Sequence, residues 1–345
     1  MPVNVLVTGA NSTVAQSIIK ALKSSPLDVR LYGTDINPFS PGLYRVHEGF
    51  LVKPYADPGY EAQMLELMAS RRIDVLLPAV EGELQQLAER RAAWEDASGA
   101  RVIVNAPALL DVAQDKYRTA CFLAEHGCNA PASMVDTRPT ALADFAARVG
   151  FPLIVKPRRG ATSRHVHVVH TLPELLDCVA RVPGPVVQEH LGSIEEEYTC
   201  GVFVDRHGTL QGVATLRRAM ANGITSTAVV ESVPDVEAEV ARIVAALKPR
   251  ASCNVQLRRN RDGQPTAFEV NARFSSSVAI RAHFGFNEVE ATIRSFVLGE
   301  EVGPLVCRPG IAMRYVNEVY ADASDVAALM SRGQHASMGI VEANF

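Results

Sequence analysis

Apolar runs and helical patterns alternate along the first third of the chain. The run Val3–Val7 ends in a Thr-Gly-Ala-Asn-Ser turn, and a helical pattern follows from Thr13 to Lys23. Apolar runs of this length are typical of buried strands. The same reading predicts strands at Leu31–Asp35, Ile73–Pro78 and Val102–Val104, and helices at Tyr60–Arg71 and Gly82–Ala97. Strand–helix alternation predicts one α/β unit with a parallel sheet over residues 1–112.

The pattern changes from Asp115 onwards, where strands begin to outnumber helices. An acidic run, Glu195–Glu197, leads into an apolar strand that ends at Asp205. The remaining predicted helices are Asp115–His126, Leu172–Arg181 and Val236–Leu247, and the remaining strands are Pro152–Pro157, His165–His170, Val186–Glu189, Ala251–Leu257 and Pro265–Val270. No Gly/Ser-rich linker interrupts the chain near residue 112, so we expect packed subdomains.

The last two of these strands carry the most informative polar residues. An Asp262-Gly263 turn separates them, which predicts a hairpin. Because alternate side chains of a strand share a face, Glu269, Asn271 and Arg273 should point the same way, with Gln256 opposite them. Oxygen ligands beside a guanidinium suit Mg²⁺ shared with nucleotide phosphates. The alternative is a hairpin with a solvated polar face.

The turn after the first strand has the character of a phosphate loop, but a weak one. Its sequence, T-G-A-N-S-T-V-A from Thr8, is not G-x-G-x-x-G, although Asp35 lies at a distance that could suit a ribose. A tight turn without cofactor is the better reading, and an NAD-dependent oxidoreductase would leave the second half unexplained. Glu81 and Glu83 follow the end of a predicted strand, at the carboxyl edge where such sheets bind ligands. The alternative is that both acids lie at a helix N-terminus and interact with the helix dipole.

Composition narrows the class of protein without naming a ligand. The chain has 345 residues, 48% of them hydrophobic and 21% charged, with a formal net charge of −4. This gives no electrostatic case for nucleic acid or an anionic membrane. No apolar run reaches the length of a membrane span, and Met1–Val7 does not read as a signal peptide. Six scattered cysteines without a C-x-x-C pair predict reduced thiols in a cytoplasm.

The order of motifs resembles the ATP-grasp superfamily over nearly the whole chain. The motifs are Asp115-Lys116, Val155-Lys156-Pro157, the Gly160 loop, Gln188-Glu189, Glu197-Tyr198-Thr199, Gln256 and Glu269-x-Asn271-x-Arg273. The run Glu269–Ser277 is similar to the large subunit of carbamoyl-phosphate synthase, and the overall plan is similar to the pyrrolysine-pathway amino acid ligase. The implied fold is α/β: a Rossmann-like pre-ATP-grasp domain (1–112), two α+β subdomains of an ATP-grasp fold (113–184 and 185–320) and a tail (321–345).

The resemblance implies ATP and Mg²⁺, or Mn²⁺, as cofactors and assigns a role to each matching residue. Lys116 and Lys156 would contact the phosphates of ATP, and the Gly160 loop would cover these phosphates. Gln188 and Glu189 would bind the adenine, and Glu197 would bind the ribose. The metal would be held by Gln256, Glu269 and Asn271, and the reacting carboxylate by Arg273. Arg273 and Lys156 are the implied catalytic residues. Glu195 and Glu196 compete with Glu197, and Lys116 has a surface salt bridge as its alternative.

Two stretches depart from the family pattern. The loop Arg158–Arg164 carries arginines, and His165 stands where glycine is common. These arginines either neutralise an anion or form a solvated turn. Ser275-Ser276-Ser277 replaces the polar pattern of biotin carboxylases and argues against that chemistry.

The function that the resemblance implies is ATP-dependent carboxylate–amine ligation through an acylphosphate, with small-molecule carboxylate and amine partners. One module alone is not expected to make carbamoyl phosphate. The alternative is a regulatory or degenerate module that binds ATP without turnover. Arg217, Arg218 and Arg281 are candidates to anchor a second carboxylate, or are solvated. A homodimer is compatible with the first unit, and no general base stands out among His165, His167 and His283.

Overall fold

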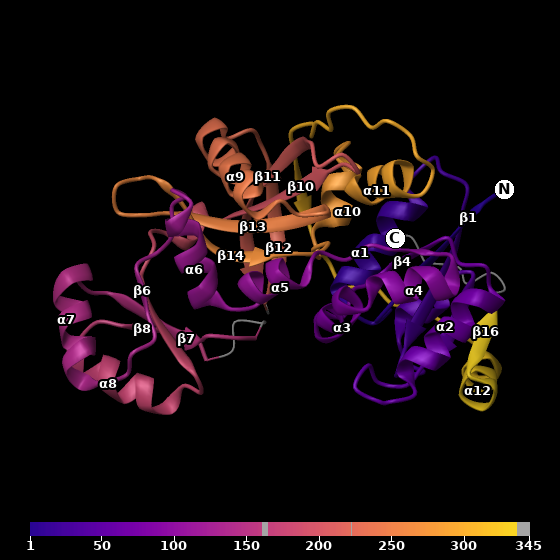
Figure 1. The fold of residues 1–345 in the computed structure, drawn as a ribbon, viewed down its shortest axis with the longest axis horizontal. Helices are drawn as coiled ribbons and strands as arrows, with labels where there is room; N and C mark the ends of the chain where they lie inside the picture. Colours follow the sequence, from indigo (N-terminus) through magenta and orange to yellow (C-terminus); the bar gives the residue numbers. More distant parts are fainter. Residues whose placement is uncertain (161–164, 222, 337–345) are drawn as a thin grey trace.

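Three β-sheets organise the computed structural model, which describes residues 1–160, 165–221 and 223–336 (Figure 1). The first sheet has the strand order β16-β3-β2-β1-β4-β5, and β1 to β5 run parallel. Its strands are β1 (Val3–Val7), β2 (Val29–Asp35), β3 (Glu48–Leu51), β4 (Val75–Leu77), β5 (Arg101–Val102) and β16 (Gln334–Ala336). The prediction of a parallel first sheet is therefore confirmed.

The first helix shows how the sequence fixes its own boundaries. The side chain of Ser12 accepts a hydrogen bond from the Ala15 N–H and caps helix α1 (Thr13–Lys23), as expected for serine at this position. Ile18 and Leu22 lie four residues apart and are both buried. The other helices of this unit are α2 (Tyr60–Ser70), α3 (Leu84–Glu89), α4 (Arg91–Ser98) and α5 (Pro107–Ala113), with 3₁₀ turns at Pro41–Tyr44 and Glu81–Glu83.

The helical pattern predicted over Gly82–Ala97 is divided into shorter elements in the structure. The segment is a 3₁₀ turn followed by two short helices that meet at Arg90, whose backbone leaves the helical region. Leu87 of α3 and Trp94 of α4 are both buried in the same core. The break at Arg90 thus lets both short helices contribute apolar side chains to that core.

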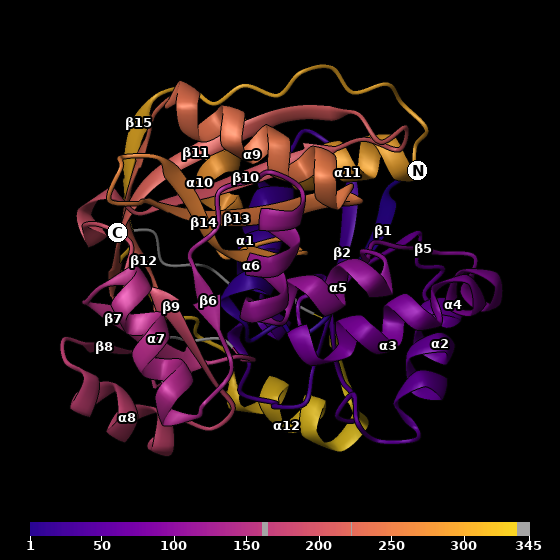
Figure 2. The same ribbon diagram turned by 60° about the vertical axis from the view of Figure 1, so that its left-hand side comes forward.

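The second and third sheets are antiparallel and belong to the remainder of the chain. The six-stranded sheet has the order β14-β13-β10-β11-β12-β15, and the four-stranded sheet the order β6-β9-β7-β8. Figure 2 shows the four-stranded sheet below the six-stranded one. Their strands are β6 (Ser133–Met134), β7 (Leu153–Pro157), β8 (His167–Val169), β9 (Pro185–Glu189), β10 (Tyr198–Val204), β11 (Leu210–Ala221), β12 (Ile224–Val230), β13 (Ala251–Arg259), β14 (Pro265–Asn271) and β15 (Gly310–Met313). The accompanying helices are α6 (Lys116–Glu125), α7 (Pro139–Val149), α8 (Leu172–Arg181), α9 (Pro234–Leu247), α10 (Val278–His283) and α11 (Glu288–Phe296), with a 3₁₀ turn at Ile194–Glu196.

The hydrophobic cores show which parts are built as one body. Leu6 and Leu76 of the first sheet share a core with Val202 and Val255 of the six-stranded sheet. Buried Asn105 joins the same two parts, since its side-chain nitrogen donates to Ala272 O at 2.9 Å. The four-stranded sheet has a core of its own with α7 and α8. The first unit and the six-stranded sheet therefore pack together through one shared core.

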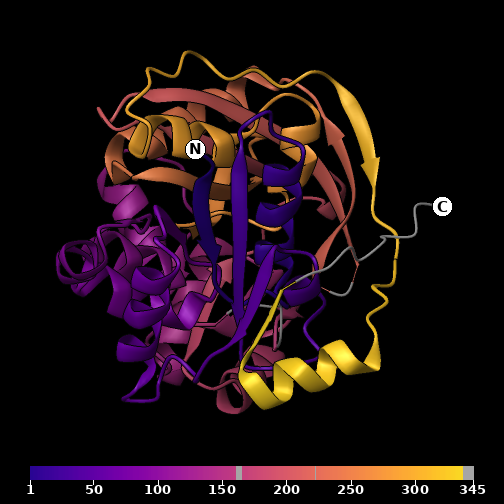
Figure 3. The ribbon, with the colours of Figure 1, turned by 90° about the vertical axis from the view of Figure 1, so that its right-hand side faces the viewer.

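The tail returns to the beginning of the chain. Helix α12 (Ala323–Arg332) leads to β16, which pairs antiparallel with β3 at the edge of the first sheet (Figure 3). Leu329 of α12 is buried against Leu43 and Tyr44. The segment that follows Tyr320 thus completes the first unit, with 337–345 outside the described residues. No helix among the described residues combines the length and apolarity needed to cross a bilayer.

Candidate functional site

A cavity of about 790 Å³ lies between the six-stranded and four-stranded sheets, and the first turn of α1 reaches its wall. All ten residues that the sequence nominated for the site line it: Lys116, Lys156, Gly160, Gln188, Glu189, Glu197, Gln256, Glu269, Asn271 and Arg273. They come from α6, β7, β9, β13 and β14 and the segments beside them. The fold therefore brings the nominated residues together, while the ligands they hold stay predictions.

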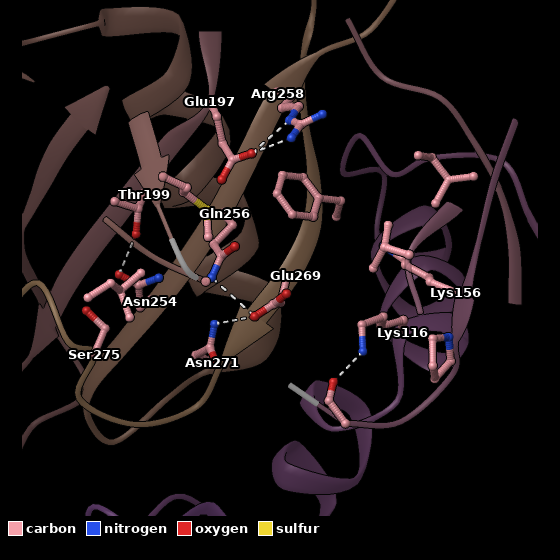
Figure 4. Close-up of a pocket in the computed structure, with 18 of the residues that line it drawn as sticks. Lys116, Lys156, Glu197, Thr199, Asn254, Gln256, Arg258, Glu269, Asn271 and Ser275 are labelled. Carbon is pink, nitrogen blue, oxygen red and sulfur yellow. Dashed lines mark hydrogen bonds and ion pairs between the residues drawn. The ribbon is translucent and has the colours of Figure 1, made fainter. Parts of the chain in front are cut away.

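Glu269 stands at the centre of one wall (Figure 4). It pairs in register with Gln256, and its Oε1 accepts hydrogen bonds from Gln256 Nε2 at 3.2 Å and Asn271 Nδ2 at 3.0 Å. Gln256 Oε1 accepts from Arg218 Nη2 at 2.8 Å, so this oxygen is already engaged by a guanidinium on one side. The carboxylate of Glu269 and the amide oxygens of Gln256 and Asn271 are suitable ligands for Mg²⁺ whose remaining ligands are oxygens of a bound molecule or water.

Two lysines face this wall from the opposite side (Figure 4). Lys156 is only 8% exposed, and its Nζ lies 5.6 Å from the centre of the Phe268 ring. Burial lowers the pKa of Lys156 to about 8, although the negative charge of Glu269 opposes this shift. Lys116 Nζ donates to Gly160 O at 2.7 Å, and burial lowers its pKa as well. The cavity therefore holds two desolvated lysine cations opposite the Glu269 carboxylate. This arrangement suits a polyanionic ligand that is bound together with a metal cation.

Glu197 is buried between two arginines. Its Oε1 accepts from Arg218 Nη2 at 2.6 Å, and its Oε2 accepts from Arg258 Nη2 at 2.6 Å. Arg218 and Arg258 also donate from Nε to the same two oxygens, each at 2.9 Å, so each carboxylate oxygen already accepts two hydrogen bonds. Glu195, which the sequence left as a competitor, is exposed, as is Glu196. The geometry thus favours Glu197 as the acid that faces the cavity.

The hinge and loop residues lie at the edges of the cavity. Gln188 donates from Nε2 to Ser133 Oγ at 2.7 Å, and its Oε1 is buried without a partner among the described residues. Gly160 has a φ of 104°, a left-handed backbone angle that favours glycine. Arg158 donates from Nε to Asp115 Oδ1 at 2.8 Å, so it is anchored by the residue that caps α6. Positions 161–164 of the predicted loop lie outside the described residues.

Arg273 connects the first unit to the site. Its Nη2 lies 2.8 Å from Glu81 Oε2, and its Nη1 donates to Phe274 O at 3.0 Å. Sequence reasoning placed Glu81 at a ligand-binding edge but did not connect it with Arg273, 192 positions away. The neighbouring Glu83 is instead buried, where it accepts a hydrogen bond from Tyr60 at 2.7 Å, and burial raises its pKa.

The three arginines expected to anchor a second carboxylate all have acidic partners. Arg217 pairs with Glu231, Arg218 with Glu197, and Arg281 with Glu288. Arg281 and Glu288 are both fully buried, so Arg281 is neither solvated nor open to a ligand. Arg281 also donates to Ser275 Oγ at 3.2 Å and to Asn254 Oδ1 at 3.4 Å. It supports two side chains of the cavity wall from behind.

The turn after β1 is held by hydrogen bonds within the protein. Asp35 accepts from the Asn11 N–H at 2.7 Å and from the Asn37 N–H at 3.0 Å. A carboxylate committed in this way holds the turn together, which argues against its use for the ribose of NAD. The strand predicted over His165–His170 is shorter, His167–Val169, and His165 lies outside it with a left-handed φ of 55°.

Comparisons with known families agree with the residue order. Residues 4–103 match the PylC-like N-terminal domain, and residues 113–277 match the ATP-grasp domain. Residues 113–277 are thus an ATP-grasp domain that follows a PylC-like N-terminal domain. The comparison with curated protein sequences gave no match.

Solved structures share the fold at low sequence identity. N5-Carboxyaminoimidazole synthetase from Staphylococcus aureus, complexed with ADP, is 15% identical, with a TM-score of 0.72, over 96% of this chain and 86% of that one. L-amino acid ligase from Bacillus licheniformis is 18% identical, with a TM-score of 0.64, over 85% and 74% of the two chains. The biotin carboxylase domain of 2-oxoglutarate carboxylase from Hydrogenobacter thermophilus, with MgADP and bicarbonate, is 15% identical, with a TM-score of 0.64, over 87% and 70%.

Proposed function

We propose that this protein is an ATP-dependent carboxylate–amine ligase that forms an amide through an acylphosphate. The observation that carries the proposal is the cavity in which buried Lys156 faces Glu269, Asn271 and Arg273. Two structural relatives, an ADP-bound synthetase and an amino acid ligase, support it. The fold alone would not support the proposed activity, because one fold can host many activities.

The cavity wall divides into parts that suit the parts of a nucleotide. Buried β9, with Gln188 and Glu189, would take the adenine, and Glu197 would accept the ribose hydroxyls in exchange for some of its hydrogen bonds from Arg218 and Arg258. Lys156, Lys116 and the backbone around Gly160 would bind the phosphates, because cations and free N–H groups stabilise phosphoryl oxygens. Mg²⁺ or Mn²⁺, held by Glu269, Asn271 and Gln256, would neutralise part of the phosphate charge.

Arg273 would position the carboxylate that reacts. A guanidinium binds a carboxylate through two parallel hydrogen bonds, and the Glu81 carboxylate already lies 2.8 Å from Nη2. The bound carboxylate oxygen attacks the γ-phosphorus and the bond to the β-phosphate oxygen breaks, which yields ADP and an acylphosphate. The amine nitrogen then attacks the acyl carbon, phosphate leaves, and the nitrogen loses a proton. Lys156 stabilises the charge that develops on the phosphoryl oxygens.

A release assay for ADP and phosphate, run over pairs of carboxylates and amines with Mg²⁺, tests this function. We expect ADP formation that depends on both partners, with an amide as the second product. Nucleotide binding without turnover across a broad set of pairs would instead favour the regulatory module. An absence of nucleotide binding would contradict both.

The pKa of Lys156 predicts a pH dependence for nucleotide binding. With a pKa of about 8, the free protein loses the Lys156 charge as the pH rises through that value. Bound phosphates favour the charged form and raise the pKa, so binding above pH 8 takes up a proton. We expect ATP affinity to be nearly constant below pH 8 and to fall above it, by up to about tenfold per pH unit.

Calorimetric titration in two buffers of different ionisation enthalpy measures this proton uptake. It should be near zero at about pH 7 and substantial at about pH 9. The matched control is Lys156→Arg, whose guanidinium stays charged and should flatten the profile. An equal pH slope in that variant would place the titrating group elsewhere.

A further inference from the structure

A second cavity, of about 520 Å³, lies beside the main one between α1, α10 and β15. The two cavities share three lining residues, Thr13, Ile224 and Ser276. The two cavities therefore adjoin each other at these residues. The function proposed above gives the side cavity no role.

Arg314 follows β15 and is held in place on this side cavity by two bonds. Its backbone N–H donates to Ser226 O at 2.8 Å, and its Nη2 donates to Ser276 O. Its other terminal nitrogen, Nη1, is buried and has no hydrogen-bond partner among the described residues. A buried donor of a charged group that stays unpaired is costly, so its retention calls for an acceptor.

The described lining of the side cavity gives Arg314 no acidic partner. None of the described residues that line this cavity is Asp or Glu. The positive charge of Arg218 acts on Arg314 from the main cavity, and the carboxylate of Glu197 is already bound to Arg218. The protein thus offers Arg314 no counterion of its own among these residues.

We propose that the side cavity is a subsite for a second anionic group of a substrate, a carboxylate or a phosphate, with Arg314 as its principal cation. The proposal rests on the proposed function for the reacting end of that substrate. It narrows the substrate class to molecules that carry an anion remote from the reacting group, and it assigns the anchoring role to Arg314 in place of Arg217, Arg218 and Arg281.

Calorimetric titration of the full-length protein with inorganic phosphate and with glutarate tests the subsite. Phosphate can also bind near Lys156, so the titrations are repeated on Lys156→Met. We expect one of the two probes to bind wild type and Lys156→Met alike, and Arg314→Gln to weaken that binding about tenfold or more, as expected for a lost charge-assisted hydrogen bond. The probe that binds more tightly tells a carboxylate subsite from a phosphate subsite.

Arg332→Gln is the matched control, because it removes the same charge from exposed α12. Arg314→Lys, which keeps the charge but lacks the second nitrogen, should bind with intermediate affinity and covers the case in which Arg314→Gln does not fold. Equal binding by wild type and the Arg314 variants, loss of binding in Lys156→Met, or no binding of either probe would overturn the proposal. Nucleotide affinity is measured separately and should be unchanged in Arg314→Gln. A wild-type protein that binds no nucleotide would contradict the proposed function, whereas the anion titrations test the subsite.

Discussion

Replacing Glu269 by glutamine is expected to lower the rate of ADP formation by roughly 10²- to 10³-fold. Glu269 is the carboxylate on which Gln256 and Asn271 converge, and it faces Lys156 across the cavity. The amide keeps the size of the side chain but removes the negative charge that would bind Mg²⁺. Steady-state ADP release over a range of Mg²⁺ concentrations measures the effect.

The control is Glu125→Gln on α6, where Glu125 is exposed. It makes the same chemical change outside the cavity and should leave turnover within about twofold of wild type. Higher Mg²⁺ should restore part of the activity of Glu269→Gln if the lost charge acts through the metal. Undiminished turnover in Glu269→Gln would show that the metal assignment is wrong.

Replacing Arg273 by lysine is expected to lower kcat/KM for the carboxylate substrate by about 10²-fold while nucleotide affinity stays unchanged. Lysine keeps the charge but cannot form the paired hydrogen bonds of a guanidinium. Glu81, the present partner of Arg273, is partly solvated, so the fold should tolerate the change. Carboxylate titrations at saturating ATP, together with nucleotide calorimetry, separate the two effects.

Arg332→Lys provides the matched control on α12, with no expected change in either quantity. If Arg273→Lys weakened nucleotide and carboxylate binding equally, Arg273 would belong to the phosphate site. A wild-type kcat/KM would remove Arg273 from the carboxylate site altogether.

The sequence could predict those parts of the site that depend on local periodicity. Glu269 and Asn271 share a face because they are two residues apart in β14, and the turn at Gly263 folds Gln256 back beside Glu269. The position of Lys156 near the end of an apolar strand was equally readable. These features depend on short stretches of neighbouring residues.

The features that were missed depend on contacts between distant segments. The pairing of Arg273 with Glu81 spans 192 positions and follows from packing of the first unit on the six-stranded sheet. The burial of Arg281 against Glu288 depends on Gly201, where a Cβ would lie 2.2 Å from Arg281 Nε. The unpaired nitrogen of Arg314 is a property of a cavity, and nothing in its local sequence distinguishes it from a surface arginine.

A crystal structure with a non-hydrolysable ATP analogue and Mn²⁺ tests the central claim most directly. Anomalous scattering should place Mn²⁺ beside Glu269 Oε2 and Asn271 Oδ1, with the β- and γ-phosphates between this ion and Lys156. A nucleotide bound elsewhere, or phosphates that contact neither Lys156 nor a metal at Glu269, would contradict the account.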